Sequence, residues 1–92
     1  MRELVEGMVR PMEVLLQETD EETEAKVVVE LRGERIAGWG RARRNPSDPV
    51  VPQIGEELAM ARALSDLSHK LLEAATAQIE RYEGTGFPCT RE

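Results

Sequence analysis

The hydrophobic period of this sequence changes once, at a segment that contains three prolines. Upstream of residue 45, apolar side chains alternate with polar ones, as they do in β-strands. From Ile54 onward they recur every three or four residues, as in an amphipathic helix. The segment NPSDPVVPQ, residues 45–53, divides the two patterns, because proline is disfavoured in central strands and helix interiors. The sequence therefore predicts strands followed by one helix, an α+β fold.

Three segments before the prolines have the pattern of strands. Residues 12–18 are MEVLLQE, and residues 24–32 are EAKVVVELR. A hairpin turn at Gly33 leads into residues 35–44, RIAGWGRARR. Strands joined by short turns pair with their neighbours along the chain, so we expect a three-stranded antiparallel sheet, a β-meander.

The C-terminal pattern predicts one long helix, residues 54–83, with Pro52 suited to its first turn. Its apolar side chains form one broad stripe, which consists of Ile54, Leu58, Ala61, Leu64, Leu71, Leu72, Ala75, Ile79 and Tyr82. The third strand alternates small residues on one face, and these are Ile36, Gly38, Gly40 and Ala42. Because glycine in a strand admits another backbone closely, we expect this face to pack against the helix.

The chain of 92 residues is predicted to form a single domain, residues 1–92. Its predicted parts are an N-terminal segment (1–11), three strands (12–44), a proline-rich loop (45–53), the long helix (54–83) and a C-terminal tail (84–92). A chain of this size buries only roughly 60–65% of its unfolded surface, so every apolar face matters to its stability.

The predicted helix is too long for the sheet. A helix from residue 52 to residue 82 spans about 45 Å, whereas a ten-residue strand spans about 33 Å. The residues left beyond the sheet are Ala75, Ile79 and Tyr82. The second face of the sheet also keeps apolar side chains, namely Leu15, Val28 and Trp39. Apolar surface in two places indicates an interface, and a homodimer covers both with a single two-fold axis.

Composition narrows the class of function. Eighteen acidic residues against twelve basic ones give a net charge of -6, which argues against general nucleic-acid binding and against DNA as a partner. The single cysteine, Cys89, cannot form an internal disulfide and suits a reducing compartment. The sequence has no apolar run long enough for a signal peptide or a membrane span. We therefore expect a cytoplasmic protein without membrane contact.

The sequence offers no candidate catalytic, cofactor-binding or metal-binding residues. His69 is the single histidine and is predicted to lie on the exposed side of the helix. There is no Cys/His cluster with metal-ligand spacing, and Gly38 and Gly40 are followed by more strand rather than by a helix that could bind phosphate. We therefore expect a protein that is not an enzyme and that needs no cofactor.

Positive charge gathers around the single tryptophan in GWGRARRNPSD, residues 38–48. The candidate interaction surface consists of Trp39, Arg41, Arg43 and Arg44. The indole could stack on a base while the guanidinium groups bind phosphates, as in other RNA-binding platforms. The alternative is that Trp39 is buried in a dimer interface and that the arginines pair with acidic residues of the same sheet, for which Glu13, Glu24 and Glu30 are available.

The loop after the third strand is predicted to be clamped to the helix. Asn45 and Asp48 lie in NPSD, a typical turn sequence. Arg62 and Asp66 are four residues apart on the helix and are expected to pair, with Asp48 reaching Arg62 from the loop. This set of four is interpreted as structural rather than catalytic.

The segment GWGRARRNPSDPVVPQIGEELAMARALSDLSHKLL resembles the signature of a small actinobacterial family of uncharacterised proteins. The matching residues are Gly38, Gly40, Ala42, Arg43, Asn45, Pro46, Asp48, Pro52, Ile54, Gly55, Glu56, Glu57, Leu58, Ala61, Arg62, Ala63, Leu64, Asp66 and Leu67. The resemblance implies a double-stranded-RNA-binding-like fold and a cytosolic dimer, and its topology is similar to part of the ribosome-hibernation factors. Unlike RNA binders of that fold, this sequence has no glycine-bounded basic loop or lysine cluster at the helix start.

These observations lead to two hypotheses. The leading one is a non-enzymatic, dimeric accessory factor of the stress or dormancy type that contacts the ribosome or structured RNA. The alternative is a protein-interaction or structural dimer module with no nucleic-acid role. A small-molecule binder in a dimer groove is a third class, which no specific residue supports. The environment of Trp39 distinguishes the first two.

Overall fold

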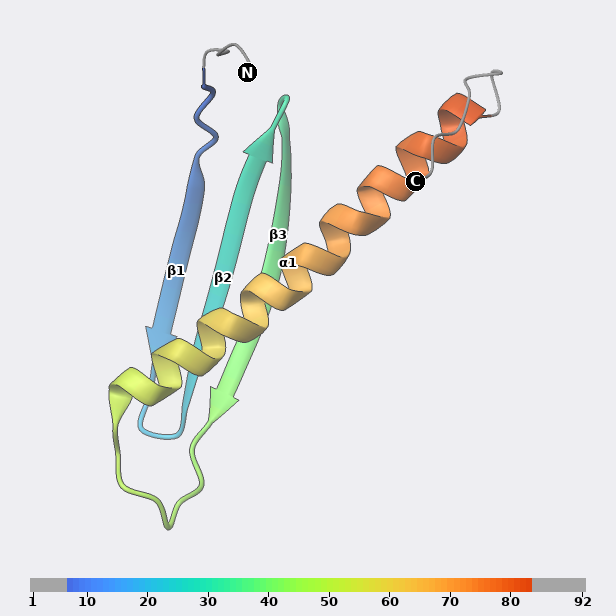
Figure 1. Ribbon diagram of the computed structural model, residues 1–92. Coiled ribbons are helices and arrows are strands. Elements are labelled where there is room, and N and C mark those ends of the chain that lie inside the picture. The colour runs from blue at the N-terminus through green and yellow to red at the C-terminus, as the bar shows by residue number, and fades with distance from the viewer. Residues whose placement is uncertain (1–6, 84–92) are drawn as a thin grey trace, which may run out of the picture.

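The computed structural model describes residues 7–83, which form a three-stranded sheet and one long helix (Figure 1). The elements in chain order are β1 (Met12–Glu18), β2 (Glu22–Leu31), β3 (Glu34–Arg43) and α1 (Pro52–Glu83). The predicted α+β class, with a three-stranded antiparallel sheet packed on one C-terminal helix, is confirmed. The predicted tail with Cys89 and the first six residues of the predicted N-terminal segment lie outside the described residues.

The sheet is a β-meander with the strand order β1-β2-β3, and both strand pairs are antiparallel. Val27 in the middle strand lies opposite Val14 of β1 and Gly38 of β3. The hairpin between β2 and β3 turns at Arg32 and Gly33, whose φ angles of 50° and 83° are both left-handed. Two consecutive positive φ angles define the type I′ turn, which suits the twist of the flanking strands.

Two predicted boundaries shift by a few residues. β2 begins at Glu22 rather than residue 24, because Glu22 and Thr23 pair with Arg43 and Ala42 of β3. Thr23 is buried, so the acidic turn before it is shorter than its polarity suggested. α1 begins at Pro52, the residue that the sequence favoured for its first turn.

The core lies between α1 and the sheet face that we call the inner face. Its buried residues are small or aliphatic, and they are Ala25, Val27, Val29, Ala42, Ala59, Ala63 and Leu67. Alanines at the contact let the helix backbone approach the sheet closely. Among the described residues, Val27 is the largest side chain that is fully buried.

Gly38 and Gly40 allow α1 to rest directly on the backbone of β3. A Cβ atom on Gly38 would lie 2.7 Å from Cβ of Leu67 and against the carbonyl oxygen of Ala63. A Cβ atom on Gly40 would collide with the backbone of Ala59 and Ala63. The prediction that this glycine face packs against the helix is confirmed.

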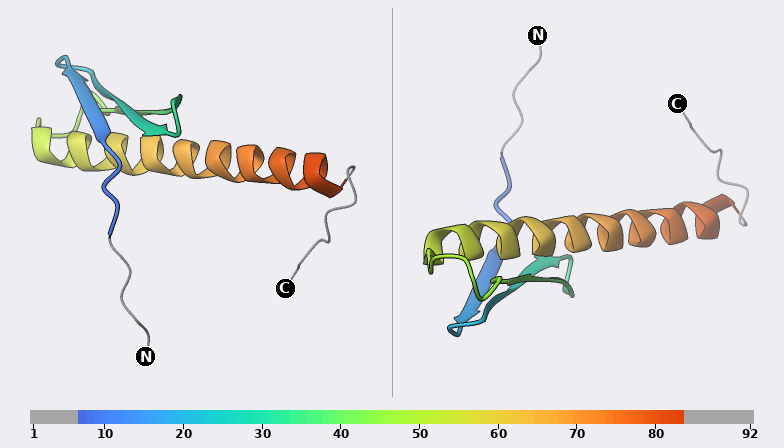
Figure 2. Two further views of the ribbon diagram at one scale, coloured as in Figure 1. Left: turned by 90° about the horizontal axis from the view of Figure 1, so that it is seen from above. Right: turned by 90° about the horizontal axis from the view of Figure 1, so that it is seen from below.

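The helix covers only part of the sheet. It packs on β2 and β3, while every residue of β1 is exposed. Its C-terminal part runs beyond the edge of β3 without further support from the sheet (Figures 1 and 2). We call residues 72–83 the overhang, and residues 72–82 of it are all exposed. The predicted exposure of Ala75, Ile79 and Tyr82 is confirmed.

Candidate functional site

Trp39 lies midway along the edge strand β3, on the sheet face opposite α1, which we call the outer face. Its side chain is 55% exposed, and Nζ of Lys26 lies 4.9 Å from the centre of its ring. Lys26 is the register partner of Trp39 on β2, and Leu15 is the register partner of Lys26 on β1. One row across the sheet thus combines an aliphatic side chain, a cation and an aromatic ring, and the cation stabilises the ring position.

The arginines that follow Trp39 on the outer face have acidic partners on β2. Arg41 lies 3.5 Å from Glu22 and 3.4 Å from Glu24, and Arg43 lies 3.5 Å from the same carboxylate oxygen of Glu22. The predicted pairing of Glu24 with these arginines is therefore confirmed. Glu22 was missed because it stands outside the strand that the alternation predicted.

The other predicted acidic residues pair with a different arginine. Arg35 lies 3.6 Å from Glu13 and 3.9 Å from Glu30, so it bridges β1 and β2 at the far end of the outer face. Across the outer face as the register defines it, four carboxylates face four cations. They are Glu13, Glu22, Glu24 and Glu30 against Lys26, Arg35, Arg41 and Arg43. The outer face carries no net charge.

Arg44 does not belong to this surface, and its inclusion was wrong. β3 ends at Arg43, and the guanidinium of Arg44 turns into the loop before α1. It donates to the carbonyl oxygens of Asp20 at 3.0 Å and Asp48 at 2.8 Å, with longer bonds of 3.4 Å to those of Asn45 and Pro46. Backbone acceptors that have no strand partner hold this cation in the loop.

The loop is clamped by its own residues. Oδ1 of Asn45 accepts hydrogen bonds from the N–H and the hydroxyl of Ser47, at 3.1 and 3.0 Å. The N–H of Asp48 donates to the Asn45 carbonyl at 2.9 Å. Asn45 and Asp48 therefore organise the loop as predicted for a turn sequence, together with Arg44.

The other half of the predicted clamp is wrong, because Arg62 and Asp66 bind the backbone of β3. Three side chains spaced one helical turn apart reach the free edge of that strand. The bonds run from Arg62 Nη1 to the Arg41 carbonyl (2.8 Å), from the Trp39 N–H to Asp66 Oδ2 (2.9 Å) and from Lys70 Nζ to the Ala37 carbonyl (2.9 Å). An edge strand points every second residue's N–H and C=O outward, and α1 crosses the edge where these groups need partners.

The carboxylate of Asp66 has a pKa below its ordinary value. The hydrogen bond from the Trp39 N–H is the largest cause, followed by Lys70, whose ammonium lies 3.1 Å away. Both interactions favour the charged form, and they outweigh a smaller opposing effect of desolvation. Asp66 is thus a charged anchor for the backbone of β3.

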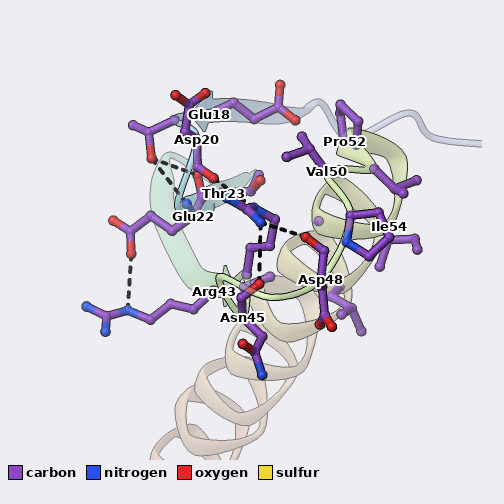
Figure 3. Close-up of a pocket in the computed structure, with 17 residues that line it drawn as sticks. Glu18, Asp20, Glu22, Thr23, Arg43, Asn45, Asp48, Val50, Pro52 and Ile54 are labelled. Carbon is purple, nitrogen blue, oxygen red and sulfur yellow. Dashed lines mark hydrogen bonds and ion pairs between the residues drawn. The ribbon is translucent and has the colours of Figure 1, made fainter.

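A cavity of about 540 Å³ lies at one end of the sheet, between the β1–β2 turn, the loop before α1 and the start of α1 (Figure 3). Acidic residues form one side of it, and these are Glu18, Asp20 and Glu22. The other side is apolar and consists of Val50, Val51, Ile54 and Leu58. Two arginines line the cavity. Arg44 is already bound to four carbonyl oxygens and Arg43 pairs with Glu22, so the cavity does not offer an anion an unpaired guanidinium.

Other candidate chemistry is absent from residues 7–83. No cluster of His, Cys, Asp and Glu there could hold a metal ion, and no helix there is both long and apolar enough to cross a bilayer. His69 is exposed as predicted, with Nδ1 3.2 Å from the Ser65 carbonyl oxygen.

Sequence comparison finds a family and several mycobacterial relatives. The family model described as Rv2632c-like matches residues 10–87. A protein of Mycobacterium tuberculosis named uncharacterized protein Rv2632c is 45% identical over 74 residues, which cover 80% of each chain. A Mycobacterium bovis protein named uncharacterized protein Mb1767 is 42% identical over 69 residues, covering 75% of this chain and 73% of that one. These matches confirm the resemblance to a small actinobacterial family.

Comparison with solved structures finds the same family as the sequence comparison. The crystal structure of Rv2632c matches with a TM-score of 0.78 at 43% identity, covering 84% of this chain and 92% of that chain. Because the match covers most of both chains, the overall architecture is shared.

Proposed function

The chain belongs to the Rv2632c-like family, and we propose that it is a non-enzymatic, homodimeric interaction module that binds protein rather than nucleic acid. In this proposal it is a cytoplasmic accessory protein without a cofactor, and Trp39 anchors its partner. One observation carries the preference for protein, namely the balance of charge on the outer face.

The three arginines of the outer face have acidic partners within the sheet, while Lys26 lies over the ring of Trp39. A phosphate that bound Arg41 or Arg43 would compete with Glu22 and would lie next to Glu24. Nucleic-acid affinity grows with the number of phosphates that basic residues neutralise, and a net charge of -6 opposes it further. Protein partners, in contrast, accept mixed charge, and exposed tryptophans are frequent anchors in their interfaces.

The leading hypothesis from the sequence, contact with the ribosome or structured RNA, is the second candidate. Its support is the exposed indole of Trp39, which is available for stacking on a base. The double-stranded-RNA-binding-like description of the fold and the likeness to ribosome-hibernation factors stay predictions. Lys26 lies over the ring of Trp39, and Arg41, two residues further along β3, pairs with Glu22 and Glu24. Neither cation is therefore free to bind a phosphate beside the stacked base.

The homodimer is supported by apolar surface that this chain does not cover by itself. The described residues include exposed Met, Val, Leu and Ile side chains on β1 and on the overhang. Exposed apolar patches of this kind mark association surfaces in soluble proteins.

Trp39 fluorescence tests the choice between protein and RNA, because it is the only tryptophan. We would titrate the purified protein with a short RNA duplex and with ribosomes at two salt concentrations, and determine its mass by sedimentation. We expect a dimer whose Trp39 emission does not respond to either titrant. A salt-sensitive quench that disappears in Arg41→Gln would overturn the preference for protein. A monomer at every concentration would overturn the homodimer.

A further inference from the structure

We propose that a second copy of this chain covers one continuous apolar surface, formed by the inner face of β1, one flank of α1 and the overhang, around a two-fold axis near Ser68. The inference rests on the homodimer of the proposed function and identifies its interface. We call this surface the dimer face.

The first part of the dimer face is the inner face of β1. Met12, Val14 and Leu16 lie opposite Val29, Val27 and Ala25 of β2, which are buried under α1. Register partners project to the same side of a sheet, so the three β1 side chains point to the side of the helix. They are nevertheless exposed, Val14 by 43%, because α1 packs on β2 and β3 only.

The second part is one flank of α1. A strip along the helix follows spacings of seven, four, four and three, which keep side chains on one side. Its members are Leu64, Leu71, Ala75, Ile79 and Tyr82. Arg62, Asp66 and Lys70 define the opposite flank, because they reach the free edge of β3. The apolar flank is therefore turned away from that edge, toward the side of β1.

Charge is rare on the dimer face although it is common elsewhere. One third of the residues of this chain are Asp, Glu, Lys or Arg. Glu18 is the one charged residue on the inner face of β1, and the flank from Leu64 to Tyr82, with Ser68 in its centre, has none. Depletion of charge is the compositional mark of the core of a protein–protein interface.

The dimer face leaves large apolar side chains in contact with solvent. Six of them are 41–51% exposed, and they are Met12, Val14, Leu16, Leu64, Ile79 and Tyr82. Contiguous apolar surface of this kind marks an association surface in soluble proteins.

A second copy fits the dimer face because the two ends of this face, β1 and the overhang, have similar lengths. The seven residues of β1 span about 23 Å, and the twelve residues of the overhang span about 18 Å. A two-fold axis midway between them lays each overhang over the β1 of the other copy, and the two α1 helices cross near Ser68. Three side chains of α1 already bind the backbone at the free edge of β3. Pairing of a strand from a second copy with that edge is therefore disfavoured.

Four lysine variants test the dimer face by sedimentation over a dilution series. Val14→Lys and Ile79→Lys place a charge in its two ends, at side chains that are 43% and 51% exposed and so are not needed for folding. Leu15→Lys is the control on the outer face of β1, and Ala77→Lys is the control about 160° around the helix from Ile79. Circular dichroism verifies that all four variants fold.

We expect the dimer dissociation constant to rise at least about tenfold in Val14→Lys and in Ile79→Lys, and to stay within about twofold in both controls. A dimer that tolerates the two test variants, or one that the controls weaken equally, would place the interface elsewhere and leave the proposed function standing. A wild-type monomer at all concentrations would remove both. A monomer that binds a different protein, with that binding weakened by the two test variants and not by the controls, would assign the dimer face to that partner instead.

Discussion

Asp66 on α1 accepts a hydrogen bond from the backbone N–H of Trp39 at 2.9 Å, so the strand that displays the indole on the outer face is tied to the helix on the inner face. Lys70 and Arg62 make the same kind of tie one turn on either side. The helix thereby closes the free edge of β3 with side chains instead of another strand. The two edges of the sheet therefore differ, because in the described chain the edge at β1 is exposed and is not covered by the helix.

Removing the Asp66 carboxylate should expose the edge of β3. In Asp66→Ala we expect the Trp39 amide to exchange its hydrogen on the order of tenfold faster or more, because it loses its acceptor. Glu73→Ala, on the overhang, is the control with the same charge change. Native-state hydrogen exchange followed by NMR gives the answer, and an unchanged rate for Trp39 would show that the bond does not protect the edge.

The lowered pKa of Asp66 predicts a pH dependence of stability. A carboxyl whose pKa is lower in the folded state than in the unfolded state stabilises the fold above its ordinary pKa, and this stabilisation is lost as pH falls through the folded value. Thermal unfolding of the wild type and of Asp66→Asn should therefore differ at pH 7 and begin to converge only below about pH 4, as pH falls toward the lowered folded pKa. A difference that persists unchanged into acid would assign the effect to shape rather than to charge.

Gly40 should tolerate no side chain. In Gly40→Ala the new Cβ meets backbone atoms of Ala59 and Ala63, and these cannot rotate away as a flexible side chain would. We expect a loss of about 2 kcal/mol or more in the free energy of unfolding, or about 10 °C in Tm at fixed protein concentration. Gly7→Ala is the matched control, since nothing lies within 4 Å of its Cβ position. Equal stability of the two variants in denaturant titrations would contradict the close helix–strand contact.

Arg32 occupies a turn position that other residues fill better. Its φ of 50° is left-handed, and the type I′ turn prefers Asn-Gly to Arg-Gly. Arg32→Asn should therefore raise the free energy of unfolding by about 0.5–1 kcal/mol. Chemical denaturation measures this, and Arg32→Gln, which removes the same charge without the left-handed preference of Asn, is the control. A destabilised Arg32→Asn would mean that the arginine side chain makes a contribution of its own.

Much of the fold follows from the two hydrophobic periods and the prolines between them. The alternation placed Val27 and Gly38 on the inner face, and the three-and-four spacing placed Ala63 and Leu67 in the helix that covers them. Those patterns depend on burial alone, which a single sequence records directly. The exposure of the overhang could also be predicted from the sequence, because the rise per residue fixes the lengths of a helix and a strand.

The partners of charged residues could not be predicted in the same way. Arg62 and Asp66 have ideal spacing for a pair within the helix, yet both bind the backbone of β3. Their true partners depend on where α1 crosses the sheet edge, and helical spacing does not contain the crossing angle. Arg44 was misplaced for a related reason, since one residue beyond a strand end the alternation no longer sets the direction of a side chain.

A thiol at position 68 gives the most direct test of where two copies meet. Near a two-fold axis a residue lies opposite its own copy, so Ser68→Cys should join two chains. Cys89 is replaced by serine in this variant to leave a single thiol, and Ala77→Cys in the same background is the control that faces away. We expect a short bis-maleimide to convert most of Ser68→Cys to covalent dimer at a concentration where Ala77→Cys stays largely monomeric on a denaturing gel. Equal cross-linking of the two would place the axis elsewhere on the helix, because chance collisions do not distinguish thiols that are both exposed.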